Sequence, residues 1–319
     1  MHRRNVLALG LAALSSRAFA QAGDSEEVIT LWPGTAPGGD GLSLPPFRAD
    51  AHEPPYIRPV DRAVYQVGTP SMVVYRPEKP DGSAIIIAPG GGYSREMFDF
   101  EGVDVARRLN QVGMTCFVLR YRLPGEGWQR RSDVPLQHAQ RAMRLVRANA
   151  ARWDIDPARV GFMGFSAGGH LACSIATRFS ALVYSAVDDA DHAEARPSFS
   201  VPMYPVVTMG AGAHQGSRDK LLGTSPTPEQ IDLYSCEKHV PPNAPPAFLA
   251  LAADDTVVLP IPNALAYYTA LRTASIPAEM HVFEDGGHGF GIARTAGHAC
   301  AVWPNLFIAW ARSHGFVRN

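Results

Sequence analysis

The apolar and polar positions of the chain follow two alternating periods, one typical of strands and one typical of helices. Short apolar runs predict strands at 83–91, 115–123, 159–165, 247–253 and 278–285. The first two are continuous and rich in β-branched or aromatic residues, as in strands buried on both faces of a sheet.

Longer stretches between these runs have helical spacing. In residues 133–153, for example, Leu136, Ala139, Met143 and Val146 share one helical face, whereas the arginines share another. Further helices are expected at 104–113, 166–179, 263–274 and 303–313. Strands that alternate with helices of this length predict an α/β fold, a doubly wound and mostly parallel sheet.

Three other segments lack this alternation. Residues 21–60 are rich in Pro and Gly and are expected to wrap irregularly over the surface. Residues 63–67 and 71–77 predict an antiparallel strand pair at a sheet edge. Residues 188–246 are irregular and predict a small cap inserted over one end of the sheet, within a single catalytic domain at 61–319.

The N-terminus has the pattern of an export signal. Arg3 and Arg4 precede an apolar segment at 6–14, and Ala18-Phe19-Ala20 matches a cleavage site. We expect residues 1–20 to be a signal peptide of the twin-arginine type and the mature protein to be periplasmic or secreted. The apolar segment is too short to anchor the protein in a bilayer.

Composition narrows the possible partners. The hydrophobic fraction of 46%, the charged fraction of 18% and the net charge of −1 fit a soluble protein without general attraction to nucleic acid or anionic membranes. Four cysteines show no metal-type spacing. A core of this size does not require a disulfide, so we expect at most one. We expect no metal or organic cofactor. The oligomeric state stays open.

Candidate chemistry begins at Ser166, in the sequence GFSAG between a strand and a helix. Gly164 and Gly168 suit a sharp turn in which a Cβ would collide, and such a turn projects the serine hydroxyl into the crevice. The helix that starts here points its free N–H groups toward a developing oxyanion. We expect Ser166 to be a nucleophile.

A base and an acid follow later strands. His288 lies in a glycine-rich loop after the strand at 278–285. Histidine suits proton transfer, because an imidazole ordinarily titrates near neutral pH. Asp255 follows the strand at 247–253 and is the preferred partner of the histidine, with Asp254 as the alternative. The order serine, aspartate, histidine is that of α/β-hydrolases.

An oxyanion site is expected at the PGGGY turn after the first buried strand. Glycines let main-chain N–H groups approach a substrate oxygen, and we assign Gly91 and Gly92 this role together with Ala167. His170, one helical turn after the serine, is expected to pack beneath the turn instead of acting as the base.

With these residues in place, the chain resembles the α/β-hydrolase superfamily and, more closely, secreted bacterial carbohydrate esterases of the acetylxylan-esterase type. The likeness extends over about residues 28–312 and includes APGGGYSREMFDFEG, DPARVGFMGFSAGGHLA, AADDTVV and EDGGHGF. Pro89 stands where related lipase-like esterases often have a histidine. The resemblance implies a serine esterase with Ser166, Asp255 and His288 as the triad, acting on acetylated fragments of plant polysaccharides.

Other activities remain open at this point. A feruloyl or broad-specificity carboxylesterase would use the same triad, and a prolyl-oligopeptidase-like peptidase or a non-catalytic carbohydrate-binding protein could share the fold. A peptidase of that type usually has a large additional domain, for which this chain has no room. Tyr93, Trp128 and Trp303 are candidate contacts for a sugar, because aromatic faces suit sugar C–H surfaces.

Overall fold

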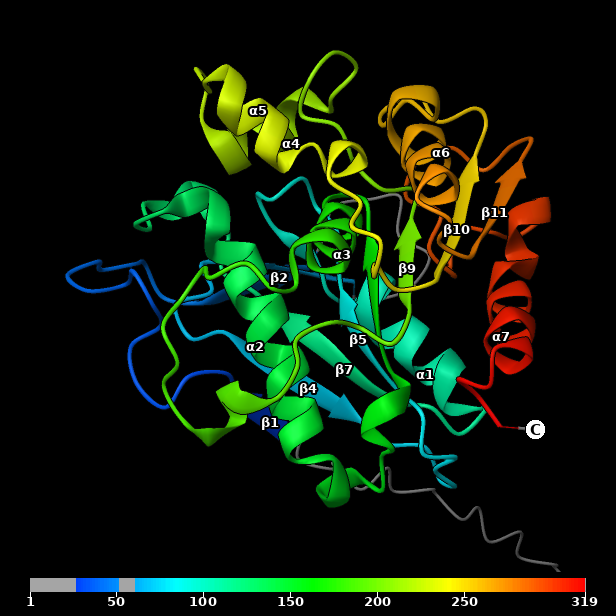
Figure 1. Ribbon diagram of the computed structural model, residues 1–319, viewed down its shortest axis with the longest axis horizontal. Helices are drawn as coiled ribbons and strands as arrows, with labels where there is room; N and C mark the ends of the chain where they lie inside the picture. The colour runs from blue at the N-terminus through cyan, green and yellow to red at the C-terminus, as the bar shows by residue number, and fades with distance from the viewer. Residues whose placement is uncertain (1–26, 52–60, 319) are drawn as a thin grey trace, which may run out of the picture.

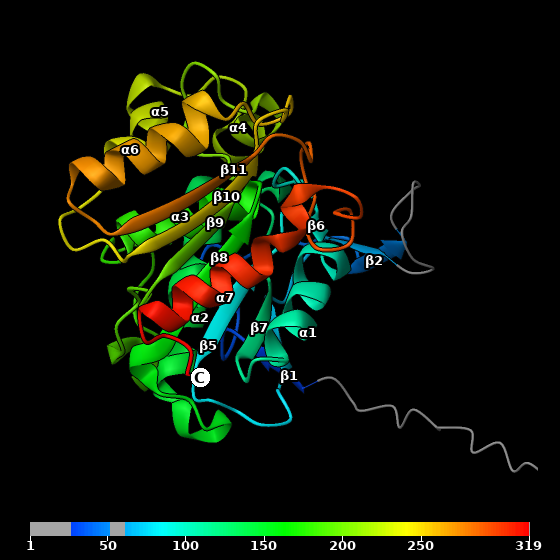
Figure 2. The same ribbon diagram turned by 90° about the vertical axis from the view of Figure 1, so that its right-hand side faces the viewer.

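The computed structural model describes residues 27–51 and 61–318, so the expected signal peptide lies outside the described residues. An eight-stranded sheet crosses the molecule in the order β1-β4-β7-β5-β8-β9-β10-β11 (Figures 1 and 2). The six strands from β7 to β11 in this order run parallel, whereas β4 and β1 are antiparallel to their neighbours. The prediction of a mostly parallel α/β sheet is confirmed. The bounds are β1 Glu27–Thr30, β4 Ser71–Tyr75, β5 Ala84–Ala88, β7 Thr115–Arg120, β8 Val160–Phe165, β9 Ser200–Met203, β10 Ala247–Ala252 and β11 Ala278–Phe283.

Helices cover both faces of this sheet. On one face lie α2 (Val134–Ala148), α3 (Ala167–Arg178) and α6 (Ala266–Thr273), and on the other α1 (Asp104–Asn110) and α7 (Trp303–Ser313) (Figure 2). Because successive strand residues point to opposite faces, Ile86 of β5 packs in the core of the α2 and α3 face, and Ile85 and Ile87 pack in the core beneath α1 and α7. This explains why the central strands are continuously apolar.

A second, three-stranded antiparallel sheet consists of β2 (Arg48–Ala51), β3 (Arg62–Tyr65) and β6 (Glu96–Met97). The expectation that residues 63–67 and 71–77 pair with each other was therefore wrong. β3 is held against β6, because the Arg62 guanidinium binds the Asp99 carboxylate at 2.7 Å just beyond that strand. β4 pairs with β1 and β7 instead.

The N-terminal segment is more regular than expected, because it supplies both β1 and β2. β1 is fixed at the sheet edge by Glu27, whose carboxylate binds Arg76 at 2.9 Å and Arg152 at 2.8 Å. The indole N–H of Trp153 also donates to it at 3.1 Å. Together these contacts attach an apparently irregular segment to the main sheet.

Residues 188–246 are not a single insertion over the sheet. β9 lies in this stretch and is buried between β8 and β10, at the centre of the fold. The hydrophobic pattern did not predict this strand, because its sequence SVPM is four residues long and contains a proline. Two short helices of the same stretch, α4 (Gln215–Leu222) and α5 (Pro228–Tyr234), lie beyond the carboxyl ends of the parallel strands (Figure 1).

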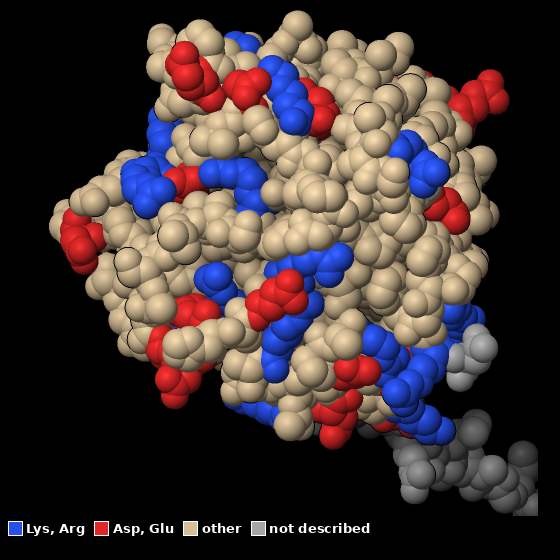
Figure 3. Space-filling view, in the orientation of Figure 1, with Lys and Arg blue, Asp and Glu red and all other residues tan. Residues whose placement is uncertain are grey.

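All four cysteines are buried free thiols. Within the described ranges, no helix has the length and apolarity to cross a membrane. On the face drawn in Figure 3, basic and acidic side chains are interspersed among large uncharged areas. This mixed surface agrees with the net charge of −1.

Candidate active site

Ser166 occupies a strained turn between β8 and α3. Its φ of 51° and ψ of −113° lie outside the common regions for a residue with a side chain, and such strain costs about 1–3 kcal/mol. A Cβ on Gly164 would overlap the carbonyl of Gly168, and a Cβ on Gly168 would overlap the carbonyl of Ala88. The two glycines therefore make the turn possible, as expected from the sequence.

Three side chains from separate strand ends form a continuous hydrogen-bonded chain. The Oγ of Ser166 lies 2.8 Å from Nε2 of His288, and Nδ1 of His288 lies 2.6 Å from Oδ2 of Asp255. The second carboxylate oxygen of Asp255 accepts the N–H groups of Val257 and Val258, each at 2.9 Å. These two bonds fix the carboxylate, and the carboxylate can fix the imidazole.

The neighbouring acid has a different contact. Asp254 accepts the main-chain N–H of Gly287 at 2.8 Å, one residue before the histidine. Asp255 is 3% exposed and faces the ring itself. The geometry therefore separates the two acids that the sequence left as alternatives: Asp255 contacts the imidazole, and Asp254 braces its loop.

The glycine turn after β5 lies beside Ser166. Gly91 and Gly92 adopt φ values of 127° and 66°, which favour glycine. Among the described residues, the structure gives the N–H groups of Gly91, Gly92 and Ala167 no hydrogen-bond acceptor. By contrast, the N–H of Gly90 is already taken by Glu101 at 2.7 Å. Three free donors are thus available near the serine for a substrate oxygen.

A pocket of about 360 Å³ opens at these residues, and we call it the Ser166 pocket. It is lined by Ser166 and His288, by the Gly91 and Gly92 turn, and by side chains from α4 and from the loop after His288. Two of the expected sugar contacts do not line it. Tyr93 is 1% exposed and Trp303 is fully buried. Trp303 donates its indole N–H to the carbonyl of Gly291 at 2.6 Å, so both rings support the site from beneath.

Comparison with known proteins shows the family to which the chain belongs. The BD-FAE family model matches residues 72–270, which include Ser166 and Asp255. The chain belongs to the BD-FAE family. An acetylxylan esterase of Xylanibacter ruminicola is 36% identical to it over 228 residues, which cover 70% of this chain and 44% of that protein. An endo-1,4-β-xylanase B of Butyrivibrio fibrisolvens is 36% identical over 209 residues, which cover 66% of this chain and 32% of that protein. The chain thus spans less than half the length of either relative.

Solved structures show the same fold. The acetyl ester-xyloside bifunctional hydrolase of Caldicellulosiruptor lactoaceticus is similar with a TM-score of 0.75 and 31% identity, over 92% of this chain and 98% of that chain. A carboxylesterase of Lactobacillus plantarum matches with a TM-score of 0.67 over 87% of this chain and 100% of that chain. Its identity of 23% supports the α/β-hydrolase fold alone.

Sequence reasoning missed one acid of this BD-FAE family protein. Glu101, in the short helical segment Asp99–Val103, is 2% exposed. Its carboxylate accepts the Gly90 N–H at 2.7 Å and the Tyr204 hydroxyl at 2.9 Å, and burial raises its pKa. Tyr204 in turn accepts the Gly291 N–H at 3.1 Å, and its ring centroid lies 5.3 Å from that of His288. Glu101 therefore joins the glycine turn to the histidine loop.

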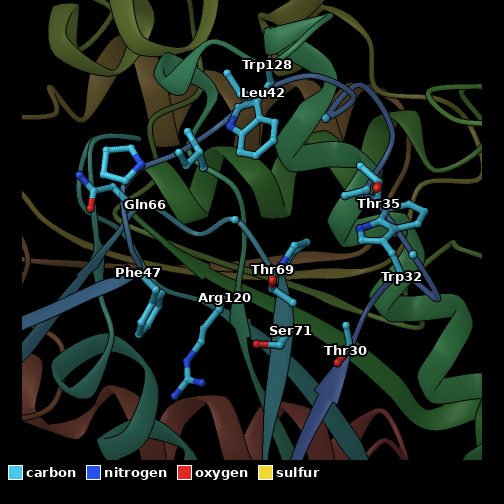
Figure 4. Close-up of a pocket in the computed structure, with 17 residues that line it drawn as sticks. Thr30, Trp32, Thr35, Leu42, Phe47, Gln66, Thr69, Ser71, Arg120 and Trp128 are labelled. Atoms are coloured by element: carbon cyan, nitrogen blue, oxygen red, sulfur yellow. The ribbon is translucent and has the colours of Figure 1, made fainter.

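A second, larger pocket of about 640 Å³ lies at the same edge of the sheet, and we call it the edge pocket (Figure 4). Its wall includes the ends of β1 and β7, and the rings of Trp32, Phe47 and Trp128 are spread around it. Trp128, the third expected sugar contact, therefore lines this pocket and not the Ser166 pocket. The segment 124–128 borders both pockets, because Gly125 lies against Lys220 of the Ser166 pocket and Trp128 lines the edge pocket.

His170 is buried beneath the serine turn, as expected. Its Nδ1 lies 2.8 Å from the Tyr93 hydroxyl and its Nε2 lies 2.8 Å from the carbonyl of Tyr234. Burial lowers the pKa of His170 to about 4, so it holds the turn as a neutral ring. Within the described ranges, no three His, Cys, Asp or Glu side chains gather closely enough to hold a metal ion.

Proposed function

We propose that this protein is a serine esterase that removes small acyl groups, acetyl above all, from carbohydrates derived from plant polysaccharides. The observation that carries the proposal is the unbroken hydrogen-bonded chain from Ser166 through His288 to Asp255, beside three unoccupied main-chain donors. The acetylxylan esterase of Xylanibacter ruminicola and the acetyl ester-xyloside hydrolase of Caldicellulosiruptor lactoaceticus support an acetylated glycan as the substrate class.

In the first step, Ser166 attacks the ester carbonyl. His288 accepts the serine proton at Nε2, and Asp255 holds the ring through Nδ1–H and stabilises the imidazolium that forms. The N–H groups of Gly91, Gly92 and Ala167 donate to the oxyanion of the tetrahedral intermediate. Collapse of the intermediate gives the acyl-serine, and His288 returns the proton to the departing sugar hydroxyl.

In the second step, water replaces the sugar. His288 takes a proton from the water, which attacks the acyl carbonyl in the same oxyanion site. The intermediate then expels Ser166, which regains its proton, and the carboxylic acid leaves. All proton transfers pass through one nitrogen, Nε2 of His288, which is already within hydrogen-bond distance of the serine.

The glycan is proposed to extend over the segment 124–128 into the edge pocket. Indole faces suit sugar C–H surfaces, and Trp128 lines that pocket with Phe47. The side chains of Gln66, Thr69 and Ser71 line the same wall and have no hydrogen-bond partner among the described residues. Such polar groups can donate to or accept from sugar hydroxyls.

The experiment compares p-nitrophenyl acetate, acetylated xylan, a feruloylated oligosaccharide and a chromogenic peptide as substrates of wild type and Ser166→Ala. Wild type is expected to release p-nitrophenol and acetate, and Ser166→Ala to lose nearly all of this activity while it folds normally. Release of ferulate without acetate would reassign the acyl group, and cleavage of the peptide alone would reassign the enzyme class. Absence of turnover on every ester would refute the proposal.

Export is a separate part of the proposal and rests on residues 1–20, whose sequence has the basic, apolar and A-x-A regions of a signal peptide. N-terminal sequencing of the protein from its host would test it. We expect the mature chain to begin near Gln21 and to be recovered outside the cytoplasm. An intact Met1 on active protein in the cytoplasm would contradict export.

A further inference from the structure

The charged side chains of the Ser166 pocket are predominantly basic. Three cationic side chains line it from three different segments: Arg95 just before β6, Lys220 in α4, and Arg294 in the loop that follows His288. They line the same pocket as Ser166. The chain as a whole is close to neutral, with a net charge of −1, so this gathering of one sign is local.

Within the described ranges, none of these three cations has a carboxylate partner in an ion pair. Arg294 lies with its guanidinium carbon 4.5 Å from the centroid of the Phe100 ring, a contact that is not an ion pair. Nε of Arg95 is buried without a hydrogen-bond partner. Some arginines outside the pocket do have such partners: Arg62 binds Asp99, and Arg141 binds Asp191 at 3.1 Å.

None of the other titratable side chains that line the pocket forms an ion pair with these cations. Glu101 is the one carboxylate among the lining residues, and both of its oxygens are occupied by the Gly90 N–H and the Tyr204 hydroxyl. Burial raises the pKa of Glu101, whereas its hydrogen bonds and the charges of His288 and Arg294 lower it. His214 also lines the pocket; burial and the nearby His288 lower its pKa, so it is uncharged at neutral pH.

A pocket lined by uncompensated cations attracts an anion, because it focuses positive potential and its guanidinium groups match a carboxylate in geometry. A neutral acetylated sugar would leave all three charges without a partner. The three cations also stand apart on different segments, so they can meet a group that projects from the sugar instead of the reacting carbonyl, which faces the glycine turn.

We propose that the preferred substrate of this site carries a carboxylate near the ester, as a glycan with a uronic acid branch does. The inference rests on the proposed esterase function and adds the chemical class of the substrate. The carboxylate could belong to the sugar or to the acyl group. Both sources share the chemistry that Arg95, Lys220 and Arg294 would recognise, and matched substrates separate them.

The test on the sugar side uses an acetylated xylo-oligosaccharide with one uronic acid branch and the same compound with the branch carboxyl reduced to an alcohol. The test on the acyl side uses p-nitrophenyl hemisuccinate and its neutral methyl ester. The quantity measured is the ratio of kcat/KM for the charged compound to that for its neutral match. We expect a ratio of about ten or more for one pair, as one charge-assisted hydrogen bond would give, and a decline of the ratio as salt is added.

Substitution of each cation tests whether the kcat/KM ratio depends on Arg95, Lys220 and Arg294. Arg95→Gln, Lys220→Gln and Arg294→Gln should each lower the ratio, mainly through a higher KM for the charged compound. Arg312→Gln and Lys79→Gln remove the same charges from exposed positions outside the pocket, and they should leave the ratio as in wild type.

The outcomes keep this inference apart from the proposed function. Turnover of the neutral compounds with ratios near one for both pairs would overturn the carboxylate preference and leave the esterase intact. A high ratio that all three pocket variants preserve would also overturn it, because the preference would then arise elsewhere. Failure to hydrolyse any of the four compounds would refute the esterase proposal itself.

Discussion

The carboxylate of Asp255 lies 2.6 Å from Nδ1 of His288, and its other oxygen is held by two main-chain N–H groups of its own loop. The main-chain bonds hold the Asp255 carboxylate in place, and the carboxylate orients the His288 ring. Asp254, one position earlier, contacts the N–H of Gly287 and not the imidazole. Adjacent carboxylates therefore have different roles, and this difference can be measured.

Asp255→Asn should lower kcat by about 10⁴-fold, because an amide in this position favours the wrong imidazole tautomer and cannot stabilise the imidazolium. Asp254→Asn should retain most activity, since its amide oxygen can still accept the Gly287 N–H. Steady-state hydrolysis of p-nitrophenyl acetate by both variants provides the comparison. Equal losses in the two, or the larger loss in Asp254→Asn, would reverse the assignment.

Glu101→Gln should change how stability depends on pH. Burial raises the pKa of Glu101 above its ordinary value of 4.5, so its stabilising contribution is full below about pH 4.5 and is lost as the pH rises through the raised pKa. The amide of the variant would remain neutral throughout. We expect wild type to lose stability relative to the variant as the pH rises above about 4.5, measured by urea unfolding. A difference independent of pH would show that Glu101 does not titrate abnormally.

His170→Gln tests a dependence of stability on pH that has the opposite sign. Burial lowers the pKa of His170 from 6.5 to about 4, so its contribution is present above pH 6.5 and is lost as the pH falls through about 4. This change in pKa corresponds to a contribution of about 3 kcal/mol at most to the free energy of unfolding. The free energy of unfolding of wild type should fall toward that of the variant on acidification, whereas the pH profile of kcat/KM should keep the shape that it has in wild type. A profile that loses its limb near neutrality would make His170 a participant in proton transfer.

Phe47→Ala tests the edge pocket. The Phe47 side chain is 52% exposed, so its removal should leave the fold intact while it removes an apolar surface for a sugar. We expect a higher KM for acetylated xylo-oligosaccharides of several units and unchanged kinetics with p-nitrophenyl acetate. Leu182→Ala, at a side chain that is 89% exposed outside both pockets, serves as the control. An unchanged KM for the long substrates would exclude a sugar at Phe47.

Local pattern was sufficient to predict the parallel sheet and the strand ends at which Ser166, Asp255 and His288 meet. Period and turn residues encode these features within short windows. β3 pairs with β6 instead of β4, and Arg62 binds Asp99 just beyond β6. Both interactions join residues far apart in the chain. No local pattern reports such a contact.

Two other features, β9 and the buried Glu101, could not be predicted from the sequence, because both depend on the fold around them. β9 has four residues and a proline at the centre of the sheet, so its strand conformation follows from burial between β8 and β10 and not from propensity. Glu101 lies in FDFEGVD, where an acid is ordinarily exposed. Only the fold shows that its carboxylate is enclosed by the Gly90 turn and Tyr204.

The central claim is that Ser166 attacks the substrate and carries the acyl group. Its most direct test is to treat the protein with diethyl p-nitrophenyl phosphate, a probe that phosphorylates activated serines, and to map the adduct by peptide mass spectrometry. We predict one diethylphosphoryl group on Ser166, with loss of ester hydrolysis in proportion to labelling and no adduct in His288→Ala. Hydrolysis that persists in the labelled protein, or an adduct on a different residue, would contradict the account.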